Sequence, residues 1–479
     1  MRALSKLWLL CLLLLLPVSG ELLAEQPQER ESCEVCGMWV DKYEHTAAEL
    51  VFKDGRKKHT CGVACMLREI DDAGGLDAFE SVKVHDWVTG ELVDADTATY
   101  VVGSQIIPDM VPNYIAFARA KDAEAFAAKE GGDIIDFNIA FKDVSPVGTT
   151  APFRIRTAVT PGSGNFSVGF VYGYSQRDGI VIGTNSVDPS AFIGGNSAQP
   201  RAPTRLEAEQ KALTFNYSPT DDLALFINIP WSDRRLKTLN RAPQTGRISE
   251  TIANESGIGD IVLEGRYNFW HSTRWDKFAT VLLGTTLPTG QFNGTRAITQ
   301  GRNLISTAPA LQLGKDTATF TGGLIYSQRY KDFWFHSSAF YTANPENSSQ
   351  YAFGDSVNGG LAFHYNPNYN LTVGVEFDAS YAWQNEDQGF KITNTGGTTI
   401  NLAVVEDWRF LNAFGGNFKL RGSVGLPIYQ DLNFSNTANA AGRPFQQVQL
   451  GEGFFANAAI TWTFRDPPDE LQHFHLKGN

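Results

Sequence analysis

The strongest constraint on the fold of this chain is a regular alternation of apolar side chains with small or polar ones. It runs from about residue 160 to residue 464. In residues 371–383 the odd positions carry Leu, Val, Val, Phe, Ala, Tyr and Trp, and the even positions carry Thr, Gly, Glu, Asp, Ser and Ala. The same contrast recurs in residues 261–269 and 418–426, where charged side chains lie on the second face. A period of two residues is typical of strands whose two faces meet different environments. This part of the chain is predicted to be β-sheet.

The number and length of these segments indicate a membrane barrel. Most are nine to thirteen residues long, and a tilted strand needs ~9–11 residues to cross a bilayer. Lipid cannot satisfy an open sheet edge, so the sheet must close on itself. We therefore expect an antiparallel transmembrane β-barrel of about 12–14 strands over residues 161–464. A soluble sandwich is the alternative, with shorter strands and charges outside. The segments lie near Phe166, Leu213, Leu223, Ile261, Phe278, Ala308, Thr319, Trp334, Val357, Leu371, Ile400, Phe418 and Phe454.

Three glycine-containing stretches of the alternating part carry a family resemblance. They are residues 257–267, 283–290 and 359–363. They resemble the outer-membrane β-barrel family labelled as the MetA pathway of phenol degradation, whose members are presumed small-molecule transporters. The resemblance implies a bacterial outer-membrane protein in contact with lipid. Trp270, Trp383, Trp408 and Trp462 are expected to lie at the two membrane interfaces.

The net charge and the N-terminal segment exclude some classes of function and indicate an exported protein. The net charge of −12 argues against binding to nucleic acid, because a phosphate-binding surface needs a basic excess. Residues 1–20 combine a basic start, an apolar run too short to span a bilayer and small residues at the end, which indicates a secretory signal peptide. Residues 144–160 are interpreted as a linker, and residues 465–479 as a polar tail. We find no motif for a hydrolase triad or a phosphate-binding loop, so the protein is not expected to be an enzyme.

All sulfur lies in the first 110 residues, which indicates a separate domain over residues 28–143. The sequence predicts a small periplasmic α+β domain. Its elements are a hairpin over residues 48–60 with a two-residue Asp54-Gly55 turn, a helix over residues 62–72 that ends at Gly74-Gly75, a strand over residues 82–87, a helix capped by Asp122 that ends at Gly131-Gly132, and a strand over residues 133–141.

Four thiols in this domain have the spacing Cys33-x2-Cys36 and Cys61-x3-Cys65. Two disulfides are one interpretation, because exported proteins meet an oxidising compartment. A zinc site with four thiolates is another. A third interpretation also uses the methionines beside the cysteines, because thiolate and thioether ligands together favour Cu(I). A thiol oxidoreductase is disfavoured, since no strong helix signal follows Cys36.

The third interpretation agrees with a resemblance over about residues 33–141. The motifs are Cys33-Glu-Val-Cys-Gly-Met38, Thr60-Cys-Gly-Val-Ala-Cys-Met-Leu67, residues 95–104, Ile107-Pro-Asp-Met110 and residues 116–132. They resemble the copper-chaperone family NosL, the accessory lipoprotein of nitrous oxide reductase. The resemblance implies periplasmic Cu(I) binding, with Cys36, Met38 and Met110 as ligands and Cys33, Cys65 and Met66 as further candidates. Cys61 could pair with Cys65 instead of contacting the metal.

These observations lead to one functional hypothesis and one rival. The hypothesis is an outer-membrane barrel whose periplasmic domain binds Cu(I) for copper capture or transport, with a periplasmic copper protein as a candidate partner. The rival is a channel for small organic molecules, whose N-terminal domain is a docking or plug module held by disulfides.

Overall fold

The structure is a computed structural model, which describes residues 30–465 except 111, 144–151, 194–200, 243–244, 273–275, 294–295, 300–301, 306–307 and 439–443. The predicted signal peptide and the tail from residue 466 onward lie outside the described residues. Among the described residues, none of the helices combines the length and apolar character needed to cross a membrane.

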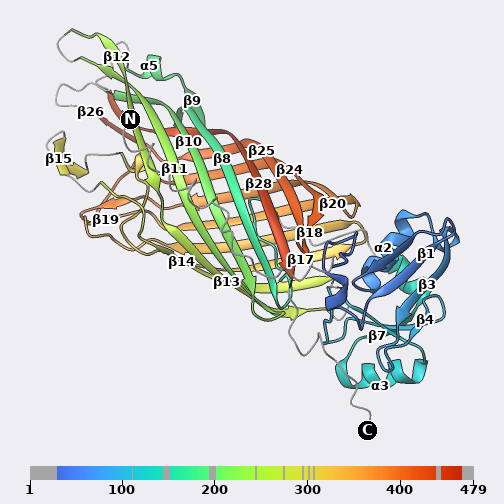
Figure 1. Cartoon of the computed structure of the whole chain (residues 1–479). Coiled ribbons are helices and arrows are strands. Elements are labelled where there is room, and N and C mark those ends of the chain that lie inside the picture. The colour runs from blue at the N-terminus through green and yellow to red at the C-terminus, as the bar shows by residue number, and fades with distance from the viewer. Residues whose placement is uncertain are drawn as a thin grey trace, which may run out of the picture. The chain divides into compact units, whose positions relative to one another are not determined.

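Two antiparallel sheets and several helices form the N-terminal domain (Figure 1). One sheet has the order β2-β1-β3-β4 and the other β6-β5-β7. A shared core includes Leu50, Leu67 and Tyr100. The predicted α+β class is thus confirmed. The elements are η1 (Val40–Lys42), β1 (Ala48–Phe52), β2 (Lys57–Thr60), α2 (Val63–Asp72), η2 (Leu76–Ala78), β3 (Phe79–His85), β4 (Leu92–Asp94), β5 (Thr99–Val102), β6 (Tyr114–Phe117), α3 (Ala120–Glu130), β7 (Asp133–Asp136) and α4 (Phe137–Asp143).

Three local predictions in this domain are wrong. Of the Asp54-Gly55 pair, only Gly55 has a positive φ, because four residues connect β1 and β2 instead of two. The N-cap position of helix α3 is occupied by Arg119, whose side chain makes no capping hydrogen bond, and Asp122 lies in the first turn. The last predicted strand ends at Asp136, whose side chain accepts a hydrogen bond from the Ile139 amide at 2.8 Å. That contact is a helix cap, so α4 begins where the strand was expected to continue.

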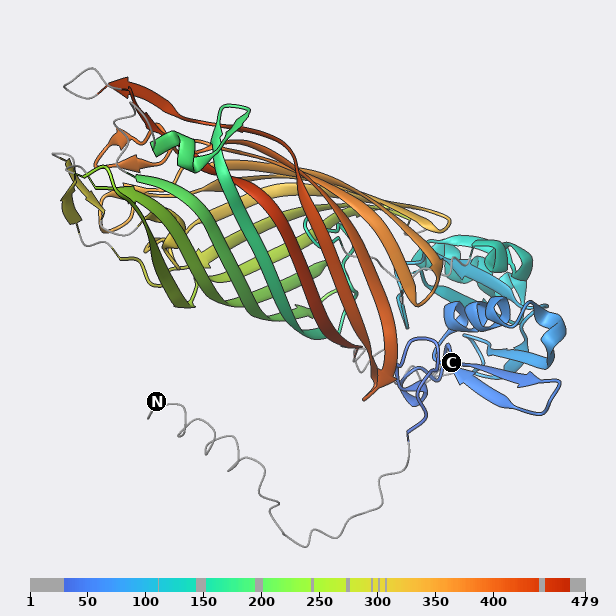
Figure 2. The ribbon, with the colours of Figure 1, turned by 90° about the horizontal axis from the view of Figure 1, so that it is seen from above.

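Twelve long antiparallel strands close into a barrel within the described part of the chain (Figures 1 and 2). Closure is achieved because β8 pairs with both β10 and β28. The predicted barrel is thus confirmed at its lower strand number. The strands are β8 (Asn165–Ile182), β10 (Arg201–Ser218), β11 (Leu223–Arg241), β13 (Ile261–His271), β14 (Lys277–Leu287), β17 (Phe320–Tyr330), β18 (Phe333–Ala343), β20 (Ser356–Asn368), β21 (Leu371–Ala382), β24 (Gly397–Ala413), β25 (Gly416–Leu432) and β28 (Gln449–Arg465).

Two details of the barrel differ from expectation. The segment near Ala308 is not a barrel strand, because Pro309–Leu311 form the 3-10 turn η3 and a proline cannot donate to a strand ladder. Half of the barrel strands are longer than predicted and reach 17 to 19 residues. Two further strands, β9 (Asn185–Val187) and β12 (Ile248–Ile258), pair with β8 and β11.

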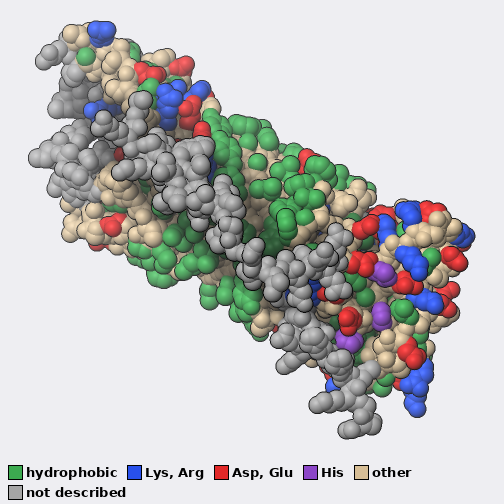
Figure 3. All heavy atoms as spheres, in the orientation of Figure 1, with side chains coloured by type: hydrophobic (Ala, Val, Ile, Leu, Met, Phe, Trp, Pro, Cys, Tyr) green, Lys and Arg blue, Asp and Glu red, His purple; other side chains and the backbone are tan. Residues whose placement is uncertain are grey.

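The two faces of the barrel wall have opposite character. Leu283 and Leu324 point outward and are 68% and 60% exposed, and apolar side chains gather on the face of the barrel that Figure 3 shows. Charged side chains such as Glu376 and Arg266 are buried on the inner face. This arrangement is the reverse of a soluble sandwich and suits a wall between lipid and a polar lumen.

The ends of the barrel establish its direction in the membrane. Short connections at residues 219–222, 331–332, 369–370 and 414–415 lie at one end, where β8 begins and β28 ends. Short turns face the periplasm in outer-membrane barrels, so the N-terminal domain, which precedes β8, is periplasmic. Trp408 lies near this end and Trp383 near the other, and both are exposed as expected for interfacial residues.

Candidate metal centre and the lumen of the barrel

Four cysteines from two separate stretches of the N-terminal domain meet in one buried cluster. One Sγ atom from each of Cys33, Cys36, Cys61 and Cys65 lies within 4.8 Å of the other three. The Sγ atoms of Cys36 and Cys61 are 3.3 Å apart, and those of Cys61 and Cys65 are 3.8 Å apart. All four side chains are buried, and none forms a disulfide in this structure. The arrangement gathers four soft donors around one point.

A tight turn presents the first two thiols. The amide of Gly37 donates a hydrogen bond to the Cys33 carbonyl at 2.7 Å, and the Cys33 amide donates to the Met38 carbonyl at 2.8 Å. Gly37 has a φ of +82°, a conformation that side chains other than glycine rarely adopt. The Cys-x2-Cys-Gly sequence thus closes on itself and directs Cys33 and Cys36 to the same side.

The start of helix α2 presents the other two thiols. Cys61 follows β2, and Gly62 is the N-cap of α2, so Cys65 lies in the first turn of the helix. The Thr46 hydroxyl donates a hydrogen bond to the Cys61 carbonyl at 2.9 Å, which fixes the junction between strand and helix. Cys61 is therefore part of the cluster, although the sequence interpretation set it apart from the ligands.

Met110 adds a thioether at the edge of the cluster. Its Sδ atom is 4.0 Å from the Cys65 Sγ and 3.3 Å from Nη1 of the buried Arg68. The preceding residue, Asp109, is buried against Gly62, where a Cβ atom would lie only 1.7 Å from the Asp109 Oδ2. A carboxylate beside a helix N-terminus is electrostatically favourable. Gly62 therefore makes room for the residue that positions Met110.

The two other candidate methionines occupy different places. Met38 packs in the same buried cluster as the four cysteines and Tyr43. Met66 is fully buried in the main core of the domain, with Leu50 and Leu67. Consecutive residues of a helix point about 100° apart, so Cys65 and Met66 face different neighbours.

Negative charge is distributed unevenly over the cysteine cluster. Burial raises the pKa of the Cys33 thiol, but hydrogen bonds from Cys36, Cys61 and Cys65 outweigh this effect and hold that pKa well below its usual value. Burial, followed by hydrogen bonds to Cys33 and Cys36, raises the pKa of Cys61 well above its usual value. Hydrogen bonds to Cys33 and Cys36 also raise the pKa of Cys65 well above its usual value. A metal that binds all four sulfurs would therefore release protons.

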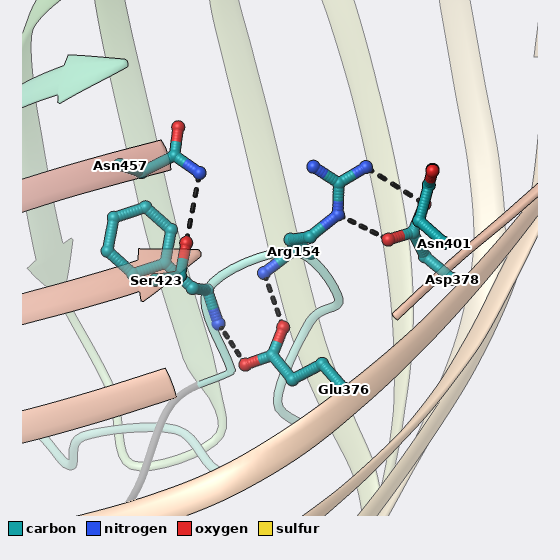
Figure 4. A network of polar contacts seen from close by, with 7 residues as sticks. Arg154, Glu376, Asp378, Asn401, Ser423 and Asn457 are labelled. Carbon is teal, nitrogen blue, oxygen red and sulfur yellow. Dashed lines mark hydrogen bonds and ion pairs between the residues drawn. The ribbon is translucent and has the colours of Figure 1, made fainter. Parts of the chain in front are cut away.

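Residues 152–160, the second half of the predicted linker, form a segment inside the barrel that we call the lumen segment. The amides of Phe153 and Arg154 donate hydrogen bonds to the two carboxylate oxygens of Glu376, at 2.6 and 2.7 Å. The Arg154 guanidinium forms an ion pair with Asp378, with Nη2 3.0 Å from Oδ2 (Figure 4). These contacts join residues more than 220 positions apart.

Further along, the lumen segment contacts the opposite part of the wall. The Arg156 Nε donates to Glu264 Oε2 at 3.3 Å, and the Ala158 amide donates to the Ser327 Oγ at 2.8 Å. The Ala158 carbonyl accepts a hydrogen bond from Thr280 Oγ1 at 2.6 Å. The segment is therefore anchored along its length by inward-facing side chains, and it fills part of the lumen.

Several functional residues had no signal in the sequence. Arg68 and Asp109 stand in stretches without a charge pattern, and the lumen segment lacks the alternation that identified the strands. Cys61 is a ligand only in the four-thiolate zinc interpretation, although its distance of four residues from Cys65 already matches metal-ligand spacing.

Together, a closed barrel with an apolar outer band and a sulfur-rich periplasmic domain define an outer-membrane β-barrel protein. Comparisons with known proteins assign a family resemblance to each part. Residues 24–145 match the family model NosL, and residues 175–398 match the model described as putative MetA-pathway of phenol degradation. Both resemblances stated from the sequence are confirmed.

The chain is also similar to individual proteins. It is 32% identical over 117 residues to the copper-binding lipoprotein NosL of Stutzerimonas stutzeri, a match that covers 23% of this chain and 61% of that protein. The chain thus spans about three fifths of that relative. Among solved structures, the COG4313 outer membrane channel from Pseudomonas putida F1 is 15% identical, with 66% of this chain and 100% of that chain covered and a TM-score of 0.46. The copper chaperone NosL from Shewanella denitrificans is 24% identical, with 26% and 96% covered and a TM-score of 0.22.

Proposed function

We propose that the N-terminal domain binds Cu(I) through Cys33, Cys36, Cys61 and Cys65, and that the protein captures or transports copper at the outer membrane. The observation that carries the proposal is the approach of four buried Sγ atoms to within 4.8 Å of one another. Soft thiolate donors select Cu(I) over hard cations. The similarity to a relative named as a copper-binding lipoprotein supports copper as the metal.

The surroundings of the cluster favour Cu(I) over zinc. Zinc also accepts four thiolates, so the cysteines alone do not distinguish the two ions. The thioether of Met110 beside Cys65 is a donor that Cu(I) accepts readily and zinc seldom uses. The buried guanidinium of Arg68, 3.3 Å from the Met110 sulfur, balances the negative charge that several thiolates and a monovalent ion would leave.

The covalent connection between domain and barrel supports a role in copper movement. Helix α4 ends at Asp143 and the lumen segment begins at residue 152, so only residues 144–151 separate the copper-binding domain from the interior of the barrel. The lumen contains the carboxylates Glu264, Glu376 and Asp378, which contact the lumen segment.

A titration of the full-length protein tests the proposal. The protein is purified in detergent, reduced anaerobically and titrated with Cu(I) against a chromophoric chelator. We expect one tightly bound copper ion per chain, and weaker binding by about tenfold or more in Cys36→Ser and Cys65→Ser. A parallel titration with Zn(II) should give weaker competition than Cu(I).

Two outcomes would contradict the proposal. Protein from native membranes that contains two disulfides and no copper would favour the channel for small organic molecules. Zinc that displaces Cu(I) at equal concentration would make the cluster a zinc site.

A second experiment tests transport. Proteoliposomes should accumulate copper faster with the natural protein than with the variant in which all four cysteines are serine. Equal rates would restrict the function to copper capture.

A further inference from the structure

A second group of metal-ligand side chains lies on the inner wall of the barrel. His336 on β18 pairs in register with Ala362 on β20, and Ala362 pairs with Glu376 on β21. His364 lies two residues from Ala362 on the same strand, so its side chain points to the same face. All three polar side chains are almost completely buried, with exposed fractions of 0% for His336, 2% for His364 and 0% for Glu376.

The three side chains lie close together, and His364 forms an ion-pair contact with Glu376. The Nε2 of His364 is 3.4 Å from the Glu376 Oε1, and the ring centres of His336 and His364 are 5.3 Å apart. Within the described part of the chain, neither ring nitrogen of His364 makes a hydrogen bond. Burial of an imidazole whose ring nitrogens make no hydrogen bond costs free energy, unless another group binds those nitrogens.

Small residues around His364 leave space for this arrangement. Ala362 stands between His336 and Glu376 in the same row. Gly374 is the register partner of His364, and a Cβ atom at Gly374 would lie 2.3 Å from the His364 Cδ2. The His364 ring therefore lies over a position that only glycine leaves open. On the other side, the Trp334 ring stacks against His336 with an angle of 5° between the planes.

We infer that His336, His364 and Glu376 form a second metal site, inside the barrel, that takes a copper ion. Imidazole nitrogens are the donors that copper and zinc share, and one carboxylate supplies the compensating charge. Diagonal neighbours on adjacent strands are within reach of long side chains, so rotation of the rings can bring their nitrogens to one ion without movement of the backbone. The choice of copper over zinc rests on the proposed function.

Metal binding at this site is connected to the lumen segment. Glu376, which would bind the ion, already accepts hydrogen bonds from the amides of Phe153 and Arg154. Ser327, which accepts a hydrogen bond from the Ala158 amide, lies 2.8 Å from the His336 Nδ1. The site thus lies between two anchors of the segment, and an ion there competes with the segment for Glu376.

The test uses the full chain without an affinity tag and with two sets of replacements, which remove the cluster thiols and the histidines of the tail. All four cluster cysteines are changed to serine, and His473 and His475 in the tail are changed to alanine. Cu(II) is added as the probe, because its electron paramagnetic resonance spectrum reports directly bound nitrogen. We expect one bound ion per chain with coupling to imidazole nitrogen. The mobility difference between heated and unheated protein in detergent gels verifies that each variant has a folded barrel.

Variants of this background identify the ligands. His336→Gln and His364→Gln should each weaken binding about tenfold or more and reduce the nitrogen coupling, and the double variant should remove it, whereas His271→Gln, on β13, should change neither the affinity nor the coupling. Gly374→Ala keeps all three ligand residues but should weaken binding, because its Cβ atom would displace the His364 ring. A folded barrel that binds no Cu(II), or a nitrogen signal that survives in the double variant, would overturn the inference. Since the cysteines are absent from this background, the result is independent of whether the N-terminal cluster binds Cu(I).

Discussion

Arg154 and Asp378 form a two-point ion pair inside the barrel, in which Nη2 donates to Oδ2 at 3.0 Å and Nε contacts the other carboxylate oxygen. The Asn401 side chain donates to the same Oδ2, also at 3.0 Å, so the carboxylate is held from the wall as well as from the lumen segment. The pair connects the segment that precedes the first barrel strand to β21, the ninth barrel strand in chain order.

Asp378→Asn is expected to loosen the lumen segment. Hydrogen bonds to charged groups contribute about 1.5–3 kcal/mol, and the amide cannot replace the ion pair. We expect a higher mean single-channel conductance in planar bilayers and faster proteolysis near residue 152. Asp233→Asn removes an ion pair with Lys211 on β10 and β11, away from the segment, and serves as the control. Equal conductance in all three proteins would show that the pair does not hold the segment.

Met110→Leu and Met66→Leu test whether Met110 is a copper ligand and Met66 a core residue. Met110 lies 4.0 Å from the Cys65 sulfur, whereas Met66 packs in the main core. Met110→Leu should weaken Cu(I) binding about tenfold, while Met66→Leu should leave it unchanged and cost less than about 1.5 kcal/mol in stability. Chelator competition and thermal unfolding measure the two effects. The reverse pattern would restore Met66 as a ligand.

Gly62→Ala should disturb the site through Asp109. The new Cβ atom would collide with a buried carboxylate, so Asp109 and the adjacent Met110 must move. We expect a loss of about 1–3 kcal/mol in stability together with weaker Cu(I) binding. Gly55→Ala is the matched control, because Gly55 has a φ of +86° and no atom near the position of a Cβ. It should cost about 1–2 kcal/mol from backbone strain and leave Cu(I) affinity intact.

The stability of the metal-free N-terminal domain should depend on pH, because the Cys33 thiol titrates at a different pH in the folded and unfolded states. Burial raises the pKa of this thiol, but hydrogen bonds from the other cysteines hold it well below its usual value. A thiol whose pKa is lower in the folded state stabilises the fold above the unfolded pKa, and this contribution is lost as pH falls through the folded pKa. Ultraviolet absorbance of thiolate should therefore persist below the usual thiol pKa. Cys33→Ser should abolish that absorbance, and its persistence in the variant would contradict the assignment.

Charges on the outer wall should destabilise the barrel according to depth. Leu324, at the middle of β17, is 60% exposed toward lipid, and Tyr330 lies at the periplasmic end of the same strand. Leu324→Arg should cost about 2–4 kcal/mol, and Tyr330→Arg about 0–1 kcal/mol. Denaturant unfolding in lipid vesicles measures both. Similar costs at the two positions would contradict a membrane-spanning wall.

The sequence predicts much of the fold, because the alternation of side chains is a local property of each strand. Residues 371–383 show both faces without any knowledge of their neighbours, and the structure places Val373 outside and Glu376 inside. The segment near Ala308 misled the prediction because apolar spacing resembles a strand, whereas Pro309 prevents one. The end of β7 was missed because the Asp136 cap is visible only when a helix follows.

The candidate sites were less predictable, because they depend on contacts between distant residues. The cysteine motifs were visible, and helical geometry alone could have separated Met66 from Cys65. The approach of Asp109 to Gly62 and the position of residues 152–160 inside the barrel depend on tertiary packing. The histidines on β18 and β20 become neighbours only through strand register, which single-strand patterns do not determine.

If the N-terminal domain passes copper to the barrel as proposed, the short stretch between Asp143 and residue 152 makes that transfer an intramolecular event. Two sites joined by a short stretch of chain meet at an effective concentration on the order of millimolar. Transfer from the sulfur cluster to a ligand in the lumen would then follow first-order kinetics, and its rate would not change when the protein is diluted in the membrane. A cell could therefore carry few copies of this protein and still deliver each captured ion at the same speed.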